Sequence, residues 1–314
     1  MYGKEIEMIE PLQDIVRHWG MDPTSFKTLL LHPNVTEVKA GGKTFYLKRS
    51  VYSSFKNRME ELYLTDYLMS HHLNVESPLL TCSQLPYVKE GEQIYSLYKA
   101  LEGTPLTEWS ADSLTNAGAY LATLHLILKD YRCHYETKGW EIESHVTEWV
   151  KELGTESIGI RGQVILSKMK GWEHSYRCLP HQFVHSDYNS GNILMQGEEV
   201  CGIIDFERIR TAPRITDIGY FLAGMLKAVP KEKKDESMKW ILAFMKGYER
   251  HAPLTAGEKR ILPSIVILFL LQYAFLTYHQ GYTESGTSCM DFIEELLASA
   301  HFHGVFQYEK EKLE

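Results

Sequence analysis

The sequence predicts an α+β fold in two unequal lobes, on three observations. Short strand-like runs and one long helix fill the first hundred residues, whereas helical periodicity dominates after Pro105. A single segment of strands and turns, residues 183–206, interrupts the helical part. The length of 314 residues is compatible with two domains, at roughly 150 residues each. We therefore expect a small N-terminal lobe, 1–99, built from an antiparallel sheet and a helix, and a larger, mainly helical C-terminal lobe, 100–314.

The N-terminal lobe is expected to begin with an amphipathic helix over residues 5–19. Alternating apolar residues then predict three antiparallel strands within residues 26–48, with Gly41-Gly42-Lys43 as the second turn. Apolar residues at helical spacing predict a helix over 54–73. Further short strands are expected over 79–82, 87–89 and 94–99.

The C-terminal lobe is expected to begin with a helix capped by Ser110, in which Leu114, Leu121 and Leu128 recur on one face. Thr255 and Glu258 form a capping-box pattern that opens an apolar helix over 258–278. The other expected helices are 141–152, 157–175, 216–227, 236–250 and 289–300.

The composition argues against several classes of protein. A formal net charge of −8 with no block of basic residues disfavours a dedicated nucleic-acid binder. The five cysteines are scattered and form no CxxC pair, so we expect reduced thiols in a cytoplasmic protein. The N-terminus shows no signal-peptide pattern. The most apolar stretch, 261–276, contains Pro263, Ser264 and Gln272, so we expect a core helix there and not a membrane span.

The residues that carry chemistry lie in the 183–206 segment. His185, Asp187 and Asn192 form an H-x-D-x4-N pattern, and Asp205-Phe206 follow after a predicted hairpin. Asp187, at a strand end, can accept a proton from an attacking hydroxyl, while Asn192 and Asp205 offer oxygen ligands to a divalent cation. Such incomplete coordination by hard oxygens suits Mg²⁺, whose shell phosphate oxygens and waters complete. The pattern therefore predicts phosphoryl transfer.

Residues 185–192, together with Ile204-Asp205-Phe206, resemble the paired motifs of the aminoglycoside phosphotransferase and choline kinase family, which shares the protein-kinase fold. Other matching segments extend the resemblance over most of the chain: Tyr46-Leu47-Lys48, residues 95–103, residues 118–125 and Asp217. Residues 95–103 are also similar to the bacterial spore-coat kinase-like branch. The resemblance implies a two-lobed protein-kinase-like fold, with nucleotide binding in the lobe 1–99 and catalysis and substrate binding in the lobe 100–314.

The resemblance also implies roles for the motif residues. Asp187 would be the catalytic base or would orient the substrate hydroxyl, and Asn192 and Asp205 would hold Mg²⁺. His185 and Asp217 would have structural roles at the catalytic loop.

Nucleotide contacts are implied in the same way. Lys48 would pair with the α- and β-phosphates of ATP, and a glutamate on the following helix would pair with Lys48. Glu60 is the first choice for that glutamate and Glu61 the alternative. The expected hinge that contacts adenine is the segment with Leu97, Lys99 and Leu101.

The sequence departs from the family pattern at several positions. The turn 31–35 contains no glycine, so backbone cradling of phosphates is not expected there. Ser186 stands where glycine is usual, and Glu207 follows Asp-Phe. Three arginines follow Asp205: Arg208, Arg210 and Arg214. One interpretation is that they bind an anionic substrate or the phosphoryl group; the other is that they form a solvated basic loop.

The expected function is ATP-dependent phosphorylation of a small-molecule hydroxyl on an amino sugar, a choline-like amine, homoserine or a sugar. One alternative is a non-catalytic or weakly active kinase-like structural protein, for instance one associated with a spore coat. A protein kinase is disfavoured, because the eleven residues between Asp205 and Asp217 are too few for an activation loop. The expected partners are ATP and the acceptor, with no nucleic acid and no membrane. We expect a monomer or homodimer in the cytoplasm, with spore association as an alternative location.

Overall fold

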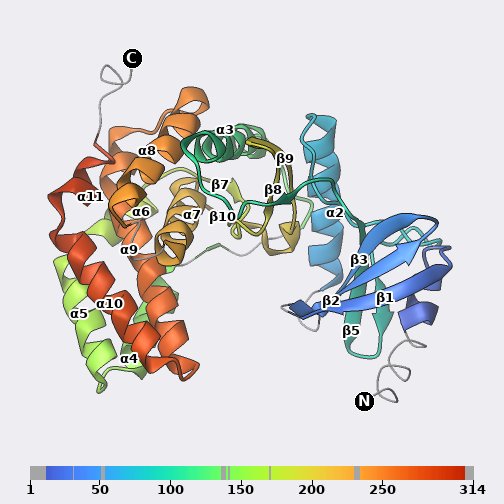
Figure 1. The fold of residues 1–314 in the computed structure, drawn as a ribbon, viewed down its shortest axis with the longest axis horizontal. Coiled ribbons are helices and arrows are strands. Elements are labelled where there is room, and N and C mark those ends of the chain that lie inside the picture. Colours follow the sequence, from blue (N-terminus) through green and yellow to red (C-terminus); the bar gives the residue numbers. More distant parts are fainter. Residues whose placement is uncertain are drawn as a thin grey trace. The chain divides into compact units, whose positions relative to one another are not determined.

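The computed structural model describes residues 12–30, 32–50, 54–135, 139–140, 142–169, 171–229 and 234–307 (Figure 1). The chain divides into two compact units. The N-terminal unit comprises Met1–Gly103, Tyr131–Glu136 and Cys201–Glu207. The C-terminal unit comprises Thr104–Asp130, Thr137–Val200 and Arg208–Glu314. Asp205 therefore belongs to the N-terminal unit, although it lies late in the sequence.

A five-stranded antiparallel sheet forms the body of the N-terminal unit, in the order β1-β2-β3-β5-β4. Its strands are β1 (Pro23–Leu29), β2 (His32–Ala40), β3 (Lys43–Ser50), β4 (Val88–Glu90) and β5 (Gln93–Lys99). Gly41 and Gly42 have positive φ angles of 55° and 72° and make the tight β2–β3 turn. All three strands predicted within 26–48 are present, but the predicted turn over 31–35 is wrong, because β2 already begins at His32 and contains Pro33 and Asn34. Residues 12–17 are helical, and the earlier part of the predicted 5–19 helix lies outside the described residues.

Helix α2 (Phe55–Ser70) follows the third strand and begins at Ser54, whose side chain accepts a hydrogen bond from the Asn57 backbone. The chain then runs through a long connection to β4. The predicted strand over 79–82 is wrong: the Thr81 amide donates to the Leu85 carbonyl at 2.8 Å, so the chain turns there. The connection instead places Val75 in a parallel bridge with Ile203, which brings residues 74–76 beside the end of β9.

The C-terminal unit is mainly helical. Its helices are α3 (Ala111–Leu128), α4 (Ile142–Glu152), α5 (Ser157–Lys168), α6 (Trp172–Arg177), α7 (Ile215–Ala228), α8 (Lys234–His251), α9 (Ala256–His279), α10 (Thr283–Ala298) and α11 (Ala300–Gly304). The predicted capping residues are confirmed, with capping boxes at Ser110 and Thr255. The predicted single helix over 157–175 is wrong, because Gly171 has a φ of 87° and separates α5 from α6.

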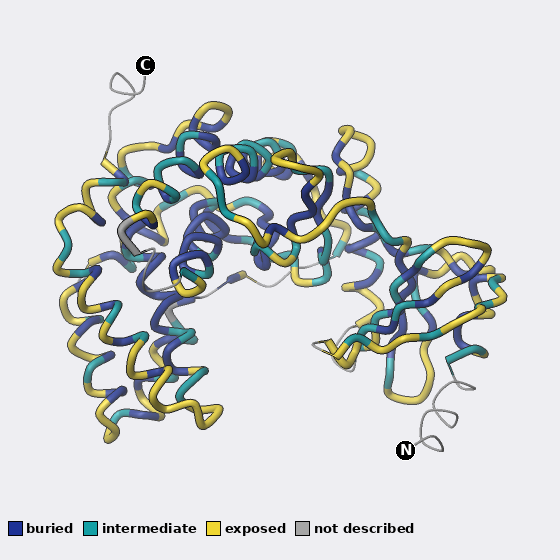
Figure 2. Tube along the Cα trace, in the orientation of Figure 1, coloured by how far each residue is buried: buried dark blue, intermediate teal, exposed yellow. Residues whose placement is uncertain are grey.

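Helix α9 packs against α4, α7 and α10 and is largely buried (Figure 2). Among the described residues, α9 is the one helix that is long and apolar enough to cross a membrane, judged by length and composition alone. In its most apolar stretch of 18 residues, however, 67% is buried inside the protein. The buried residues run from Ile261 to Leu271 almost without interruption. The prediction of a core helix over 261–276 is confirmed.

Short strands position the motif residues. They are β6 (Thr104–Pro105), β7 (His181–Val184), β8 (Ile193–Gln196), β9 (Glu199–Ile203) and β10 (Arg210–Pro213). Strand β7 pairs with β10, and β8 lies between β6 and β9. The Asp187 loop connects β7 to β8, and the chain then turns at Gly197 into β9, which leads to Asp205.

Candidate active site

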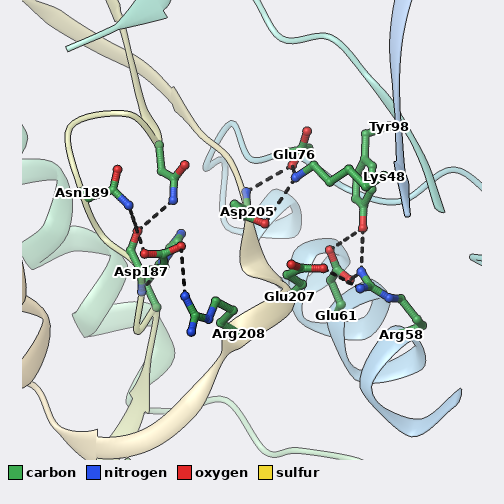
Figure 3. Close-up of polar contacts among 12 residues, drawn as sticks. Lys48, Arg58, Glu61, Glu76, Tyr98, Asp187, Asn189, Asp205, Glu207 and Arg208 are labelled. Atoms are coloured by element: carbon green, nitrogen blue, oxygen red, sulfur yellow. Dashed lines mark hydrogen bonds and ion pairs between the residues drawn. The ribbon is translucent and has the colours of Figure 1, made fainter. Parts of the chain in front are cut away.

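Lys48 extends from β3 into a cluster of two carboxylates within the N-terminal unit (Figure 3). Its Nζ atom donates to Glu76 Oε2 at 2.6 Å and to Asp205 Oδ1 at 3.3 Å. The ammonium group also lies 4.6 Å from the centre of the Tyr98 ring. Burial alone would lower the pKa of Lys48, but the charges of Glu76 and Asp205 outweigh it and raise that pKa above its ordinary value. The two carboxylates therefore favour the charged form of Lys48 and hold its ammonium group in place.

Glu76 is the carboxylate that positions this cluster. Its side chain is only 4% exposed, and its Oε2 accepts a hydrogen bond from the Asp205 backbone amide at 3.1 Å as well as the one from Lys48. The Glu76 amide in turn donates to the Ile203 carbonyl at 2.9 Å. A single carboxylate thus connects the lysine of β3 to the backbone that carries Asp205.

The structure does not bring Glu60 to Lys48, which corrects the expected pairing. Glu60 instead accepts hydrogen bonds from the Tyr131 hydroxyl at 2.5 Å and from the His134 and Tyr135 amides at 2.9 and 2.8 Å. All three donors lie in the segment that follows α3 and belongs to the N-terminal unit. Glu60 therefore fastens that segment to α2 through hydrogen bonds.

The alternative, Glu61, acts on Lys48 through charge and makes no hydrogen bond to it. Its carboxylate accepts from Arg58 at 2.7 Å and from the Tyr98 hydroxyl at 2.8 Å. Burial raises the pKa of Glu61, and the charges of Arg58 and Lys48 oppose that rise. Periodicity had placed both glutamates on the correct helix, but it could not indicate that a loop residue would occupy the position beside Lys48.

Asp205 has a left-handed backbone conformation, with a φ of 74°. Such a conformation is strained for a non-glycine residue and is kept where the surroundings enforce it. Phe206 is buried after it, and Glu207 Oε2 accepts from the buried Arg58 guanidinium at 2.5 Å. Glu76 on one side and Arg58 on the other therefore hold the Asp205–Glu207 segment.

The residues expected at the hinge lie at and after the end of β5. Leu97 is fully buried in the core of the N-terminal unit, and its carbonyl accepts from the Leu79 amide at 2.8 Å. Lys99 is exposed at the last position of the strand, and Leu101 is partly exposed just beyond it. Leu97 is thus a core residue, whereas contact of Lys99 and Leu101 with adenine stays a prediction.

In the C-terminal unit, buried Asp217 holds the backbone of the Asp187 loop. Its two carboxylate oxygens accept from the amides of His185 and Ser186, both at 2.8 Å. His125 lies 3.0 Å from the same carboxylate. Ser186 has a φ of 60°, and its hydroxyl donates to the Arg208 carbonyl. This hydrogen bond helps to hold serine in a conformation that glycine adopts more readily.

The two oxygens of the Asp187 carboxylate differ in their hydrogen bonds. Oδ1 accepts from the Tyr220 hydroxyl at 2.8 Å and from Asn189 Nδ2 at 3.0 Å. Oδ2 lies 3.9 Å from Arg208 Nη1, beyond hydrogen-bond distance. Burial, followed by the interactions with Tyr273 and Asp187, raises the pKa of Tyr220 above its ordinary value, so its hydroxyl remains a donor. The arrangement fixes the carboxylate through Oδ1 and leaves Oδ2 as the oxygen able to accept a proton.

Asn192 uses its amide nitrogen to donate to the Asp187 carbonyl at 2.9 Å. Its Oδ1 is therefore the atom of this side chain that can bind a cation. The amide oxygen of Asn192 and the carboxylate of Asp205 are each hard donors of the kind that Mg²⁺ takes. The described residues contain no cluster of three or more His, Cys, Asp or Glu side chains that would form a separate metal site.

Solved structures define the fold of this chain. An amicoumacin kinase in complex with AMP-PNP, Ca²⁺ and Ami superposes with a TM-score of 0.76 at 18% identity, over 99% of both chains. A microcompartment-associated aminopropanol kinase gives 0.67 at 16% identity, over 95% of this chain and 96% of the other. A choline/ethanolamine kinase family protein from Mesorhizobium loti gives 0.61 at 13% identity, over 90% and 91%. The fold is therefore kinase-like, as the motif resemblance implies.

The sequence comparisons agree on the family. Residues 32–257 match the model of the phosphotransferase enzyme family, and the chain belongs to that family. A homoserine kinase from Gluconobacter oxydans (strain 621H) is 27% identical over 220 residues, which are 66% of this chain and 67% of that protein. A homoserine kinase from Neisseria meningitidis serogroup B is 25% identical over 173 residues, and the match spans 54% of each protein, or about half its length.

Proposed function

We propose that this protein transfers the γ-phosphoryl group of ATP to a hydroxyl group of a small molecule. The observation that carries the proposal is the Asp187 carboxylate, fixed through one oxygen by Tyr220 and Asn189 while the other makes no hydrogen bond within the described residues. A substrate hydroxyl that donates to Oδ2 would be oriented for attack, and Asp187 would accept its proton as transfer proceeds.

Residues 1–99 would bind the nucleotide and residues 100–314 the acceptor. Lys48 would contact the α- and β-phosphates, with Glu76 orienting its ammonium group. Asn192 and Asp205 would hold Mg²⁺, which when bound neutralises phosphate charge. Lys99 and Leu101 would lie along the adenine. The fixed cation of Lys48 supplies locally the positive charge that a protein of net charge −8 lacks as a whole.

The acceptor belongs to one of four classes: homoserine, an amino sugar, a choline-like amine or another sugar. The homoserine kinase relatives favour the first of these. A cytoplasmic location fits ATP as the donor, and either a monomer or a homodimer is compatible with a site of this kind.

The test is an ATP-dependent phosphorylation screen of acceptors from the four classes, with Mg²⁺, read by mass spectrometry of the products. We expect one class to be phosphorylated and Mg·ATP to raise the melting temperature, because a ligand that binds only the folded state stabilises it. If no acceptor is phosphorylated and millimolar Mg·ATP gives no shift, the alternative of a non-catalytic, spore-coat-type structural protein replaces the proposal.

A further inference from the structure

Three arginines follow Asp205 in the sequence, and the structure separates them into two kinds. Arg214 makes a two-pronged contact with Glu258, at 2.7 and 3.0 Å, and donates to the Pro253 carbonyl at 2.8 Å. This pair connects the start of α7 to the capping box of α9. Arg214 therefore has a structural role that needs no ligand.

Arg208 and Arg210 have no such partner. The Arg208 side chain is 56% exposed, and its contact with a carboxylate is the 3.9 Å approach to Asp187 Oδ2. The side chain of Arg210, partly buried on β10, makes no hydrogen bond or ion pair with a described residue. Burial lowers the pKa of Arg210, and the neighbouring positive charge of Arg208 lowers it further.

The strand pairing places these arginines at the catalytic loop. Arg210 lies opposite Val184, where paired residues of antiparallel strands are about 5 Å apart. Val184 leads within three residues to Asp187, and the Arg208 carbonyl is held by Ser186. Both arginines are thus attached through their backbone to the loop that presents the proton acceptor.

Two adjacent guanidinium groups repel each other, and burying one without a counter-ion costs free energy. Asp187 cannot neutralise both guanidinium groups, because it lies 3.9 Å from Arg208 and forms no ion pair with Arg210. A carboxylate matches the paired donors of a guanidinium group in geometry and charge. An anionic group on the bound molecule would therefore remove the repulsion.

We propose that Arg208 and Arg210 bind a carboxylate of the acceptor, so that the substrates of this protein are hydroxyl compounds that also carry a carboxylate. This inference rests on the proposed phosphotransferase function and narrows it: neutral sugars and choline-like amines without an anionic group are then poor acceptors. Phosphate oxygens of the nucleotide have the same chemistry as a carboxylate toward guanidinium groups, so the experiment measures KM for ATP beside KM for the acceptor.

The experiment uses matched acceptors, L-homoserine and 3-aminopropan-1-ol, which share the amine and the primary hydroxyl and differ by the carboxylate. A second matched set consists of other hydroxy acids and their amides. In the wild type we expect kcat/KM for the acid to exceed that for its neutral partner at least tenfold. Arg210→Gln is expected to reduce that preference to near unity through KM for the acid, with KM for ATP unchanged.

Arg250→Gln is the matched control, because it removes an exposed arginine of the same unit at the end of α8. It should retain the preference for acids. Equal turnover of acids and neutral partners by the wild type would overturn the inference while leaving phosphotransferase activity established. A rise in KM for ATP in Arg210→Gln, with the acid preference retained, would assign the arginines to the nucleotide.

A binding readout covers the case in which no acceptor is phosphorylated. Acids that raise the melting temperature of the wild type and of Arg250→Gln, but not of Arg210→Gln, support the carboxylate site even though the proposed function has failed. No shift with any acid overturns it.

Discussion

Tyr220 determines which oxygen of Asp187 is available to a substrate. Its hydroxyl and Asn189 both donate to Oδ1, so the carboxylate cannot rotate without losing two hydrogen bonds. Tyr220 is itself enclosed by Trp140, Phe269 and Tyr273. It is a positioning residue and not a catalytic one, because it acts on the substrate only through Asp187.

Tyr220→Phe removes the hydroxyl and keeps the ring packing. We expect kcat to fall about tenfold, since a loosened catalytic group loses orientation, while KM for ATP stays unchanged. Tyr131→Phe is the control: it removes a buried hydroxyl bonded to Glu60 within the N-terminal unit, and should lower stability but not kcat. An unchanged kcat in Tyr220→Phe would show that Asp187 is oriented by other means.

At the residue scale the sequence predicts the motif residues but not all of their partners. His185, Asp187, Asn192 and Asp205 are identifiable because they stand at fixed spacing. Glu76 is not, because it lies in a loop without periodicity and reaches Lys48 only through the pairing of Val75 with Ile203, far away in the sequence. Long-range contacts of this kind leave no local signal.

At the scale of elements, helices with strong local signals are the ones predicted well. The N-cap residue Ser110 and the capping-box pattern at Thr255 identify the starts of α3 and α9. The errors come from competing local geometry: Gly171 breaks a helix whose apolar pattern continues across it, and the turn at Thr81 replaces a strand of suitable composition. The short strand β10 is missed because its pairing with β7 is set by the tertiary structure.

The packing of α3 against α8 in the C-terminal unit depends on glycine. A Cβ atom at Gly247 of α8 would lie 1.8 Å from the Thr115 carbonyl oxygen of α3. Gly247→Ala should therefore force the helices apart and destabilise the protein by about 1–3 kcal/mol, measured as a lower melting temperature. Gly224→Ala in α7 is the control, because its nearest neighbour, the Tyr273 hydroxyl, is 3.7 Å away. Equal melting temperatures for the two variants would contradict this packing.

At the scale of the whole molecule, the two units carry different parts of the proposed chemistry. The N-terminal unit holds a charged lysine, two carboxylates and the strained Asp205 backbone in one hydrogen-bonded cluster. The C-terminal unit holds a carboxylate with one oxygen fixed, and a buried aspartate beneath it. The sequence predicts a boundary after residue 99 and places Asp205 in the C-terminal lobe, whereas the structure groups Cys201–Glu207, which includes Asp205, with the N-terminal unit.

In the proposed reaction, Asp187 accepts the proton of a hydroxyl during phosphoryl transfer. The most direct measurement compares phosphorylated product formed by the wild type and by Asp187→Asn under saturating Mg·ATP. Asparagine keeps the size of the side chain and removes the proton acceptor, so we expect kcat to fall at least about a hundredfold, with melting temperature and Mg·ATP affinity retained. Full turnover by a folded Asp187→Asn protein would show that Asp187 is not the proton acceptor.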